Sequence, residues 1–413
     1  MSLKITEVKS ATVVGNYYWT YARVYAGDLY GTGEGFFAPS LEDTIREFGR
    51  VIIGENALDV NRVCDKLHWA AVPSGASGAN YHALSALNIA LLDLVGKHLN
   101  VPIYTLLGGK FRDRVRVYVD THAGEALEAM DSVTLPITTK WMREEGTRVE
   151  ETGAPAHGRA YIETFTDAYT PEAYGKRAKQ MRDEGYSAIK FDLDVPTPYT
   201  KDYNRASGSL TNKEVEYLAE LVGSVRSSAE EADILFDLHW RFNVESAIRL
   251  AKAVEQYHVM WLEDPVPPAN PELFKTVTSS TSTPIATGEN LYTRYEFMKV
   301  LGSGIRIITP DILKTGGPSA SRFIAELAGL NEITVSPHNI SSPIGTMAQA
   351  HFAAAISNFG VLEFHGHDVP IWWRLANKEI IKDGFIEMTD EPGLGVELNE
   401  EVAAKYSLGE FQL

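Results

Sequence analysis

Apolar and polar positions along the chain follow two different rhythms, which change near residue 112. In the first part, residues 3–15 and 20–37 alternate between apolar and polar side chains, a pattern that predicts strands. The closely spaced Gly31, Gly33 and Gly35 predict a tight turn or bulge beside them. Three segments with helical spacing follow, at 41–53, 57–69 and 80–98. Strands followed by helices indicate a small α+β domain.

From Arg114 onward, short apolar runs alternate with amphipathic segments. The apolar runs predict eight strands, at 114–121, 187–192, 233–238, 258–263, 284–288, 305–310, 332–337 and 360–364. The segments between them predict helices near 171–185, 211–228, 243–256, 270–279, 293–301, 316–329 and 343–357. Eight strands with intervening helices are typical of an α/β fold of the (β/α)8 TIM-barrel type.

The predicted organisation is an N-terminal α+β capping domain at 1–112, the barrel at 113–375, and a C-terminal segment at 376–413 that packs on the capping domain. Two connections, 123–168 and 194–210, are too long for simple loops and leave from the C-terminal ends of predicted strands. Such insertions serve as lids, as oligomer contacts or as disordered segments. The sequence leaves these three alternatives open.

Composition narrows the class of protein. The 413 residues carry a net charge of −17 and no run of basic residues, so nucleic acid and anionic membranes are poor partners. The single cysteine, Cys64, excludes an internal disulfide and fits a reducing compartment. The N-terminus lacks the apolar core of a signal peptide, and no stretch has the ~18 consecutive apolar residues that a membrane helix needs. A soluble cytoplasmic protein is expected.

Three acidic residues, Asp237, Glu263 and Glu289, stand 26 positions apart, each at the end of a short apolar run. A β/α unit has about this length, so the spacing predicts three carboxylates at the C-terminal ends of successive parallel strands, the face that carries a barrel's active site. At 4 Å and an effective dielectric constant near 20, each pair would repel by roughly 4 kcal/mol. A divalent cation relieves this repulsion, and oxygen ligands suit Mg²⁺ best. The pattern predicts a magnesium-dependent enzyme.

Other predicted strand ends carry groups that fit one type of reaction. On the second strand, Lys190 and Asp192 are two apart and therefore point to the same side. His239 stands two residues after the first predicted metal ligand and is positioned to donate a proton. Asp311 and His338 end neighbouring strands, where the carboxylate can hold the imidazole and make it a general base. The remaining strand ends in Glu363.

With these residues, the chain resembles the enolase superfamily, in the mandelate racemase-like branch that contains the sugar-acid dehydratases. The resemblance covers nearly the whole length. It is carried by the segments 85–97, 101–109 and Trp261-Leu-Glu-Asp-Pro265, and by the pairs Gly288-Glu289, Pro310-Asp311 and Gly316-Gly317. In that superfamily a Lys or His base and magnesium stabilise an enediolate.

The resemblance implies a role for each strand-end residue. The three spaced carboxylates would hold one Mg²⁺ per subunit, Asp311 and His338 would form the base dyad, and Glu363 would bind the substrate carboxylate. His239 would be the acid for a departing hydroxyl. Racemase-type relatives have a second lysine where this chain has Asp192, so two-base racemisation is disfavoured. Asp192 would then either bind substrate or pair with Lys190.

Together these features predict a dehydratase of an aldonate. His338 takes the C2 proton, the metal-stabilised enediolate expels the C3 hydroxyl with a proton from His239, and a 2-keto-3-deoxy sugar acid results. The alternatives are an epimerase, racemase or cycloisomerase acting through the same enediolate, and a non-catalytic sugar-acid binding protein. Substrate contacts are expected from Tyr18, Trp19, His365 and Trp372. Relatives imply a homo-oligomer, as a dimer, tetramer or octamer.

Overall fold

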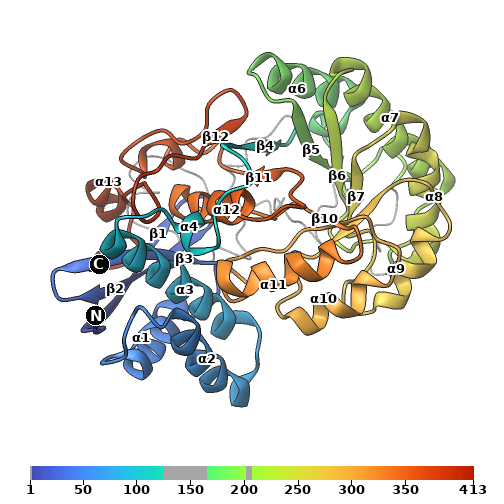
Figure 1. Cartoon of the computed structure of the whole chain (residues 1–413). Coiled ribbons are helices and arrows are strands. Elements are labelled where there is room, and N and C mark those ends of the chain that lie inside the picture. Colours follow the sequence, from blue (N-terminus) through green and yellow to red (C-terminus); the bar gives the residue numbers. More distant parts are fainter. Residues whose placement is uncertain (1, 124–164, 201–206) are drawn as a thin grey trace. The chain divides into compact units, whose positions relative to one another are not determined.

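The computed structural model describes residues 2–123, 165–200 and 207–413 (Figure 1). The chain forms two compact units. Unit 1 comprises Met1–Arg116, Glu289–Phe297 and Pro310–Leu413, and unit 2 comprises Val117–Gly288 and Met298–Thr309. The predicted insertion 123–168 falls largely outside the described residues, and 194–210 does so at 201–206. The role of both insertions stays a prediction.

Unit 1 begins with a three-stranded antiparallel sheet in the order β1-β2-β3. Its strands are β1 (Glu7–Val14), β2 (Tyr18–Ala26) and β3 (Leu29–Gly35). The strand expected at 20–37 is therefore wrong in one respect, because the chain turns back at Gly27, whose φ is 65°. Glycine adopts this left-handed conformation without a steric cost, which allows the tight connection.

The predicted turn at Gly31, Gly33 and Gly35 is also wrong, because all three glycines lie inside β3. The reason is packing against a helix, α3 (Gly78–Leu99). A Cβ at position 31 would lie 2.1 Å from the carbonyl oxygen of Ala90, and one at position 33 would lie 2.1 Å from that of Ala86. Only glycine lets the strand approach the helix backbone this closely.

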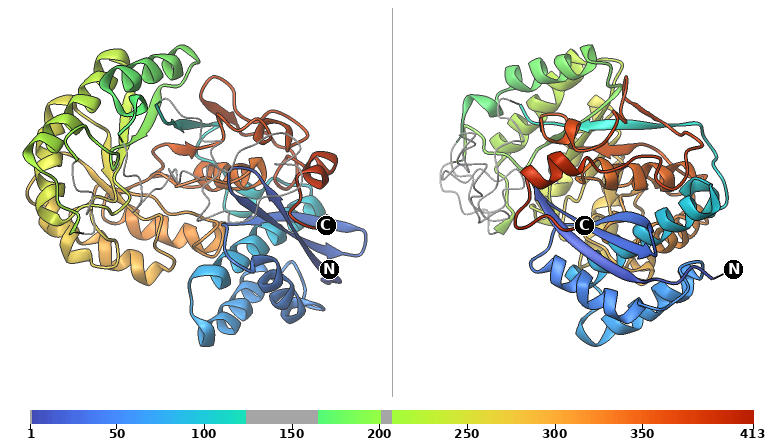
Figure 2. Two further views of the ribbon diagram at one scale, coloured as in Figure 1. Left: turned by 180° about the vertical axis from the view of Figure 1, so that it is seen from behind. Right: turned by 90° about the vertical axis from the view of Figure 1, so that its left-hand side faces the viewer.

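In unit 1, α1 (Leu41–Ile52) and α3 pack on the sheet, and the remaining helices of this part, α2 (Val60–Ala71) and the short α4 (Ile103–Leu106), pack on them (Figure 2). The apolar faces of these helices meet the strands in one buried cluster, which includes Val24, Ile45, Leu67 and Leu91. Burial of these side chains provides the main driving force for this part of the fold.

Unit 2 contains parallel strands that pair in chain order. They are β4 (Arg114–Asp120), which enters unit 2 at Val117, β5 (Ala188–Asp192), β6 (Asp233–Asp237), β7 (Trp261–Glu263), β8 (Ile285–Thr287) and β9 (Ile307–Ile308). The helices of the series are α6 (Pro171–Asp183), α7 (Asn212–Ser228), α8 (Val244–Val254) and α9 (Pro271–Thr278). Figure 1 shows them along one side of β5, β6 and β7.

Each of these four helices begins after a capping residue. Thr170, Thr211, Asn243 and Asn270 each accept a hydrogen bond from a backbone N–H of the first turn. Thr211 forms a capping box with Glu214, whose carboxylate accepts a hydrogen bond from the Thr211 backbone N–H. Such caps typically contribute ~1 kcal/mol each. They fix the residue at which each helix starts, and this sets the length of the loop that follows the preceding strand.

The chain crosses between the units in α10 (Arg294–Leu301), and unit 1 holds the last two strands of the β/α series. Its elements here are α11 (Pro318–Gly329), β10 (Thr334–Val335), α12 (Pro343–Ala354) and β11 (Leu362–Phe364). Val335, the last residue of β10, forms a parallel bridge with Phe359, and the Glu363 N–H donates to the Pro337 carbonyl. All eight predicted strands are therefore present, although several are shorter than predicted.

The C-terminal residues return to the sheet of unit 1. After β12 (Phe385–Glu387) and α13 (Glu400–Lys405), the Leu408 N–H donates to the Thr12 carbonyl, and Glu400 pairs with the buried Arg23 at 2.6 Å. The domain boundaries 1–112, 113–375 and 376–413 stay a prediction. Across the described ranges, no helix has the length and apolar character needed to span a membrane.

Candidate active site

The predicted site residues of unit 2 lie at the C-terminal ends of neighbouring strands. Asp192 ends β5, Asp237 ends β6 and Glu263 ends β7. Strand pairing sets Asp192 opposite Asp237, and Asp237 opposite Glu263. One carboxylate oxygen of Asp237 and one of Glu263 lie within 4.8 Å of one another, and both side chains are fully buried. The equal spacing in the sequence thus corresponds to adjacent, equivalent strand positions.

The buried Lys190 neutralises part of this acidic pair. Its Nζ lies 2.9 Å from Asp237 Oδ2 and 3.3 Å from Glu263 Oε2. The indole N–H of Trp261 donates to Glu263 Oε2 at 3.1 Å. Burial alone would raise the pKa of Asp237, but the charges of His239 and Lys190 outweigh it and hold that pKa below its usual range. The Asp237 carboxylate is therefore ionised in the neutral pH range.

His239 follows the end of β6 and lies among carboxylates. Its backbone N–H donates to Asp237 Oδ1 at 2.9 Å. The ring has two distinct sides, because Nδ1 lies 3.3 Å from Asp194 Oδ1 while Nε2 lies 3.8 Å from Asp237 Oδ1. Burial lowers the pKa of His239, but Asp237, Asp192 and Asp194 outweigh it and raise that pKa well above its ordinary value. The imidazole is thus suited to carry a proton.

His122 and Asp194 belong to this cluster, and the sequence interpretation missed both. His122 Nε2 lies 2.8 Å from Asp192 Oδ2, and the Asp192 carboxylate comes within 3.9 Å of His239 Nδ1. His122 stands two residues after β4, and Asp194 two residues after β5. Both happen to continue the period of two past the strand end, where the strand pattern no longer requires it. The ion pairs of Lys190 run to Asp237 and Glu263.

In unit 1, Asp311 and His338 form the predicted dyad. His338 Nδ1 lies 2.9 Å from Asp311 Oδ2, and both side chains are buried. The Leu313 N–H donates to Asp311 Oδ1 at 2.7 Å. Gln349, on α12, donates from Nε2 both to Asp311 Oδ1 at 3.0 Å and to the His338 carbonyl at 2.9 Å. The glutamine is a further positioning group that the sequence interpretation missed.

The Nε2 edge of the His338 ring lies near two carboxylates. Its Nε2 lies 3.5 Å from Glu289 Oε2 and 3.9 Å from Glu363 Oε2. Burial lowers the pKa of His338, but Glu289, Glu363 and Asp311 outweigh it and raise that pKa to about 9. Glu363 is held by the Asn339 N–H at 2.8 Å, so its carboxylate has a fixed position.

Along the chain, Glu289 comes directly after the last long segment of unit 2 and begins a segment of unit 1. It stands two residues after β8, and β8 pairs in parallel with β7, which ends in Glu263. Its Oε1 accepts a hydrogen bond from the Asn290 amide at 3.1 Å. Asn290 in turn accepts from Lys314 Nζ at 3.4 Å, and this ammonium lies 3.8 Å from the centre of the Phe36 ring. The third predicted metal ligand thus follows the next strand, as the spacing indicates.

The predicted substrate-binding aromatics all lie in unit 1. Trp19 and Trp372 are packed side chains, with 2 % and 1 % exposure, and their indole N–H groups donate to the backbone carbonyls of Ile340 and Ser341. His365 Nδ1 lies 3.2 Å from the Asn16 amide nitrogen. Tyr18 begins β2. Substrate contact by these four residues stays a prediction.

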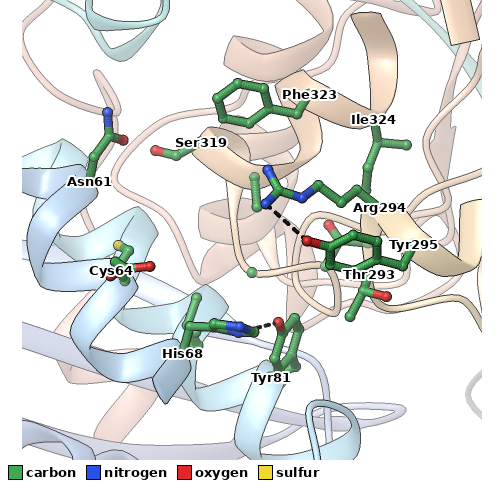
Figure 3. Close-up of a pocket in the computed structure, with 15 residues that line it drawn as sticks. Asn61, Cys64, His68, Tyr81, Thr293, Arg294, Tyr295, Ser319, Phe323 and Ile324 are labelled. Carbon is green, nitrogen blue, oxygen red and sulfur yellow. Dashed lines mark hydrogen bonds between the residues drawn. The ribbon is translucent and has the colours of Figure 1, made fainter. Parts of the chain in front are cut away.

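A cavity of about 420 Å³ lies elsewhere in unit 1, lined by residues of α2, α3, α10 and α11 (Figure 3). Two of its polar contacts join lining residues to each other, His68 Nδ1 to the Tyr81 hydroxyl at 2.7 Å and Arg294 to the Tyr295 hydroxyl at 3.4 Å. The predicted site residues are not among those that line it. The volume of a cavity alone therefore does not identify the site in this chain.

Comparison with known proteins gives a consistent result. The N-terminal domain of mandelate racemase and muconate lactonizing enzyme matches residues 6–108, and the enolase C-terminal domain-like family matches residues 173–402. A D-xylonate dehydratase of Haloferax volcanii is 39% identical over 401 residues, which cover 96% of this chain and 87% of that protein. The D-galactonate dehydratase family member RspA of Pantoea ananatis is 32% identical over 329 residues, covering 79% and 74%.

Solved structures agree with the family match. The crystal structure of a mandelate racemase/muconate lactonizing enzyme-like protein from Rubrobacter xylanophilus superposes with a TM-score of 0.84 and 36% identity, covering 98% of both chains. The predicted fold class, a (β/α)8 barrel with an N-terminal α+β domain, is confirmed by this likeness together with the family matches.

Proposed function

Because this chain belongs to the mandelate racemase/muconate lactonizing enzyme family within the enolase superfamily, we propose that it is a dehydratase of sugar acids. The substrate class follows from its relatives, which are named as dehydratases of D-xylonate and D-galactonate. The observation that carries the proposal is His239, a buried imidazole that faces the carboxylate of Asp237 with its Nε2. An acid in this place is what expulsion of a hydroxyl requires.

The proposed cofactor is one Mg²⁺ per subunit, held by Asp237, Glu263 and Glu289. Two observations support the fit. Asp237 and Glu263 are fully buried carboxylates whose oxygens lie within 4.8 Å of one another, and the single ammonium of Lys190 is shared between both. Donors that are all carboxylate oxygens suit a hard cation. When bound, the ion supplies positive charge where negative charge develops on the substrate carboxylate.

His338 is the proposed general base for the C2 proton, and it acts in its unprotonated form. A cation held by Glu289 would offset one of the carboxylates that raise the pKa of His338. Asp311 holds its Nδ1, which leaves Nε2 as the atom that accepts the proton. As the C2–H bond breaks, its electron pair passes toward the substrate carboxyl group. Lys190 contributes a fixed, buried positive charge to the same region, and it needs no reorganisation during the reaction. Glu363 is proposed to bind the substrate through its carboxyl group.

His239 is the proposed general acid. The electron pair from C2 forms the C2–C3 double bond, the C3–O bond breaks, and the proton of His239 converts the departing hydroxide into water. The resulting enol takes up a proton at C3, loses the proton of its C2 hydroxyl and becomes a 2-keto-3-deoxy acid, so the net change is the loss of one water. Since the C-terminal strand ends of a (β/α)8 barrel converge on one face, the fold lets residues of β6 and β10 serve one substrate.

The test is a product screen. The purified protein with Mg²⁺ is incubated with stereoisomers of five- and six-carbon aldonates, and keto acids are trapped and identified. Formation of a 2-keto-3-deoxy acid is expected from at least one aldonate. Racemisation, epimerisation or ring formation without keto acid would favour the alternatives that use the same enediolate. Binding without proton exchange at C2 would favour a non-catalytic sugar-acid binding protein.

His239→Asn gives the sharper prediction. This variant should lose keto acid formation by ~10²–10⁴-fold, the usual contribution of a general acid. It should still exchange the substrate C2 proton for deuterium in D₂O, because His338 is intact. Loss of exchange together with dehydration would contradict an acid-only role. A homo-oligomeric state, which the resemblance implies, and a cytoplasmic location, expected from the sequence, are part of the same proposal.

A further inference from the structure

We propose that Asp194 is a positioning residue that fixes the ring of His239, so that the site contains a second aspartate–histidine dyad. This inference rests on the proposed function, since it assigns to Asp194 an effect on the acid step. The predicted site residues do not include Asp194, which stands two residues beyond the end of β5. It is 5 % exposed, and His239 is 4 % exposed.

The geometry of His239 repeats that of His338. In His338, Nδ1 lies 2.9 Å from the Asp311 carboxylate, while Nε2 faces Glu289, a proposed metal ligand, at 3.5 Å. In His239, Nδ1 lies 3.3 Å from the Asp194 carboxylate, while Nε2 faces Asp237, another proposed metal ligand, at 3.8 Å. Each imidazole therefore has one nitrogen held by an aspartate and the other directed toward a metal-ligating carboxylate.

Asp194, not Asp192, is the partner that the distances favour. Asp192 also faces His239 Nδ1, but at 3.9 Å, and its Oδ2 already accepts from His122 Nε2 at 2.8 Å. Its backbone carbonyl accepts from the Tyr174 hydroxyl at 2.8 Å, which fixes the end of β5 on the outer side. The Leu193 N–H donates to the Asp237 carbonyl, and this bond holds the segment that carries Asp194 against β6.

A fixed ring matters because proton donation depends on direction. An imidazole that rotates about its Cβ–Cγ bond presents Nε2 to the leaving group only part of the time. A carboxylate that binds Nδ1–H stops this rotation, so that the proton on Nε2 is the one that is transferred. Asp194 touches neither the substrate nor the ion in this proposal. It acts through His239.

The experiment compares Asp194→Asn with the wild-type enzyme in Mg²⁺, on an aldonate that the wild type dehydrates. We expect the kcat for keto acid formation to fall by ~10²-fold, the low end of what a general acid contributes, while C2 deuterium exchange changes by less than about threefold. Continued exchange also shows that the variant is folded. Parallel loss of both activities, or loss of neither, overturns the proposal.

Two variants give matched controls. Asp183→Asn makes the same chemical change at the exposed end of α6, where Asp183 pairs with Arg182, and should leave both activities at the wild-type level. Asp311→Asn removes the partner of the other imidazole and should reduce exchange and dehydration together. Asp192→Asn should reduce kcat less than Asp194→Asn does. A larger effect at Asp192 would assign the positioning role to that residue and overturn the proposal.

A measurement without substrate separates this inference from the proposed function. The ring ¹⁵N resonances of His239 report which nitrogen carries the proton and how it is hydrogen-bonded. They should shift in Asp194→Asn and stay unchanged in Asp183→Asn, even if no aldonate is dehydrated. Asp194 also lies near Asp192 and His239 in an arrangement that could hold a cation. Loss of a second bound Mg²⁺ in Asp194→Asn, measured by calorimetry, would replace the positioning role with metal binding.

Discussion

Gln349→Leu should weaken the base dyad without touching the substrate. The glutamine amide donates to Asp311 Oδ1 at 3.0 Å and to the His338 carbonyl at 2.9 Å, and so it links both members of the dyad to α12. Leucine has a similar volume and no donor. Because the amide Nε2 is the donor in both bonds, one substitution removes both and leaves the surrounding helix, with its buried apolar face, intact.

The size of the effect follows from these two bonds. A hydrogen bond to a charged acceptor contributes roughly 1.5–3 kcal/mol and one to a neutral carbonyl roughly 0.5–1.5 kcal/mol. Asp311 keeps its hydrogen bonds from the Leu313 N–H and from His338, so its carboxylate remains partly fixed in place. We therefore expect a loss of about 1–3 kcal/mol in transition-state stabilisation, which corresponds to about a 5- to 150-fold decrease in kcat.

The assay measures C2 deuterium exchange and keto acid formation on the same substrate, with Mg²⁺ affinity as a check that the site is intact. Both rates should fall by the same factor, because dehydration needs the C2 proton to leave first. Gln180→Leu, on the exposed side of α6, is the matched control. The reasoning is refuted if Gln349→Leu retains the wild-type kcat, or if only KM changes.

Two further predictions concern the supports of the site. Trp261→Phe removes the indole donor to Glu263 and should weaken Mg²⁺ binding by about tenfold, the lower end for such outer partners, as measured by calorimetry; an unchanged affinity would contradict this. Burial raises the pKa of Glu34 to about 7 from 4.5, although bonds from the α12 N-terminus at Ser342 and Gly345 oppose the rise. The stability that Glu34 contributes is therefore fully present below pH 4.5 and is lost as the pH rises through 7. Chemical unfolding should show the wild type losing about 2–3 kcal/mol relative to Glu34→Gln between pH 5 and pH 8, and parallel pH profiles would contradict the assignment.

The sequence predicts the eight strands of the β/α series well, because most are short, largely buried apolar runs between amphipathic helices. Equal spacing then predicts which positions end neighbouring strands, and Asp237 and Glu263 lie side by side as expected. The glycine cluster in β3 was misinterpreted for a physical reason. Glycine serves both tight turns and close packing, and only the position of α3 decides between them.

Residues beyond the strand ends were harder to predict. His122 and Asp194 stand two positions past a strand, where the alternation of sides no longer has to hold. Gln349 lies in a helix whose other buried residues are mostly apolar, and a polar residue there has no periodic signal of its own. For the predicted aromatic contacts the difficulty is different, because a signal was present but does not distinguish two roles. Trp19 and Trp372 fill the interior, and composition does not distinguish a core indole from a ligand-binding one.

The two imidazoles have equivalent partners, so their different roles must come from their positions along the substrate. Three carboxylates surround His239 and three surround His338, and each ring has an aspartate on Nδ1. A base next to C2 controls every later step, whereas an acid next to C3 controls only the last one. The ratio of exchange to dehydration therefore identifies which is which. It should rise in Asp194→Asn and stay at the wild-type value in Gln349→Leu, and the opposite pattern would exchange the roles of β6 and β10.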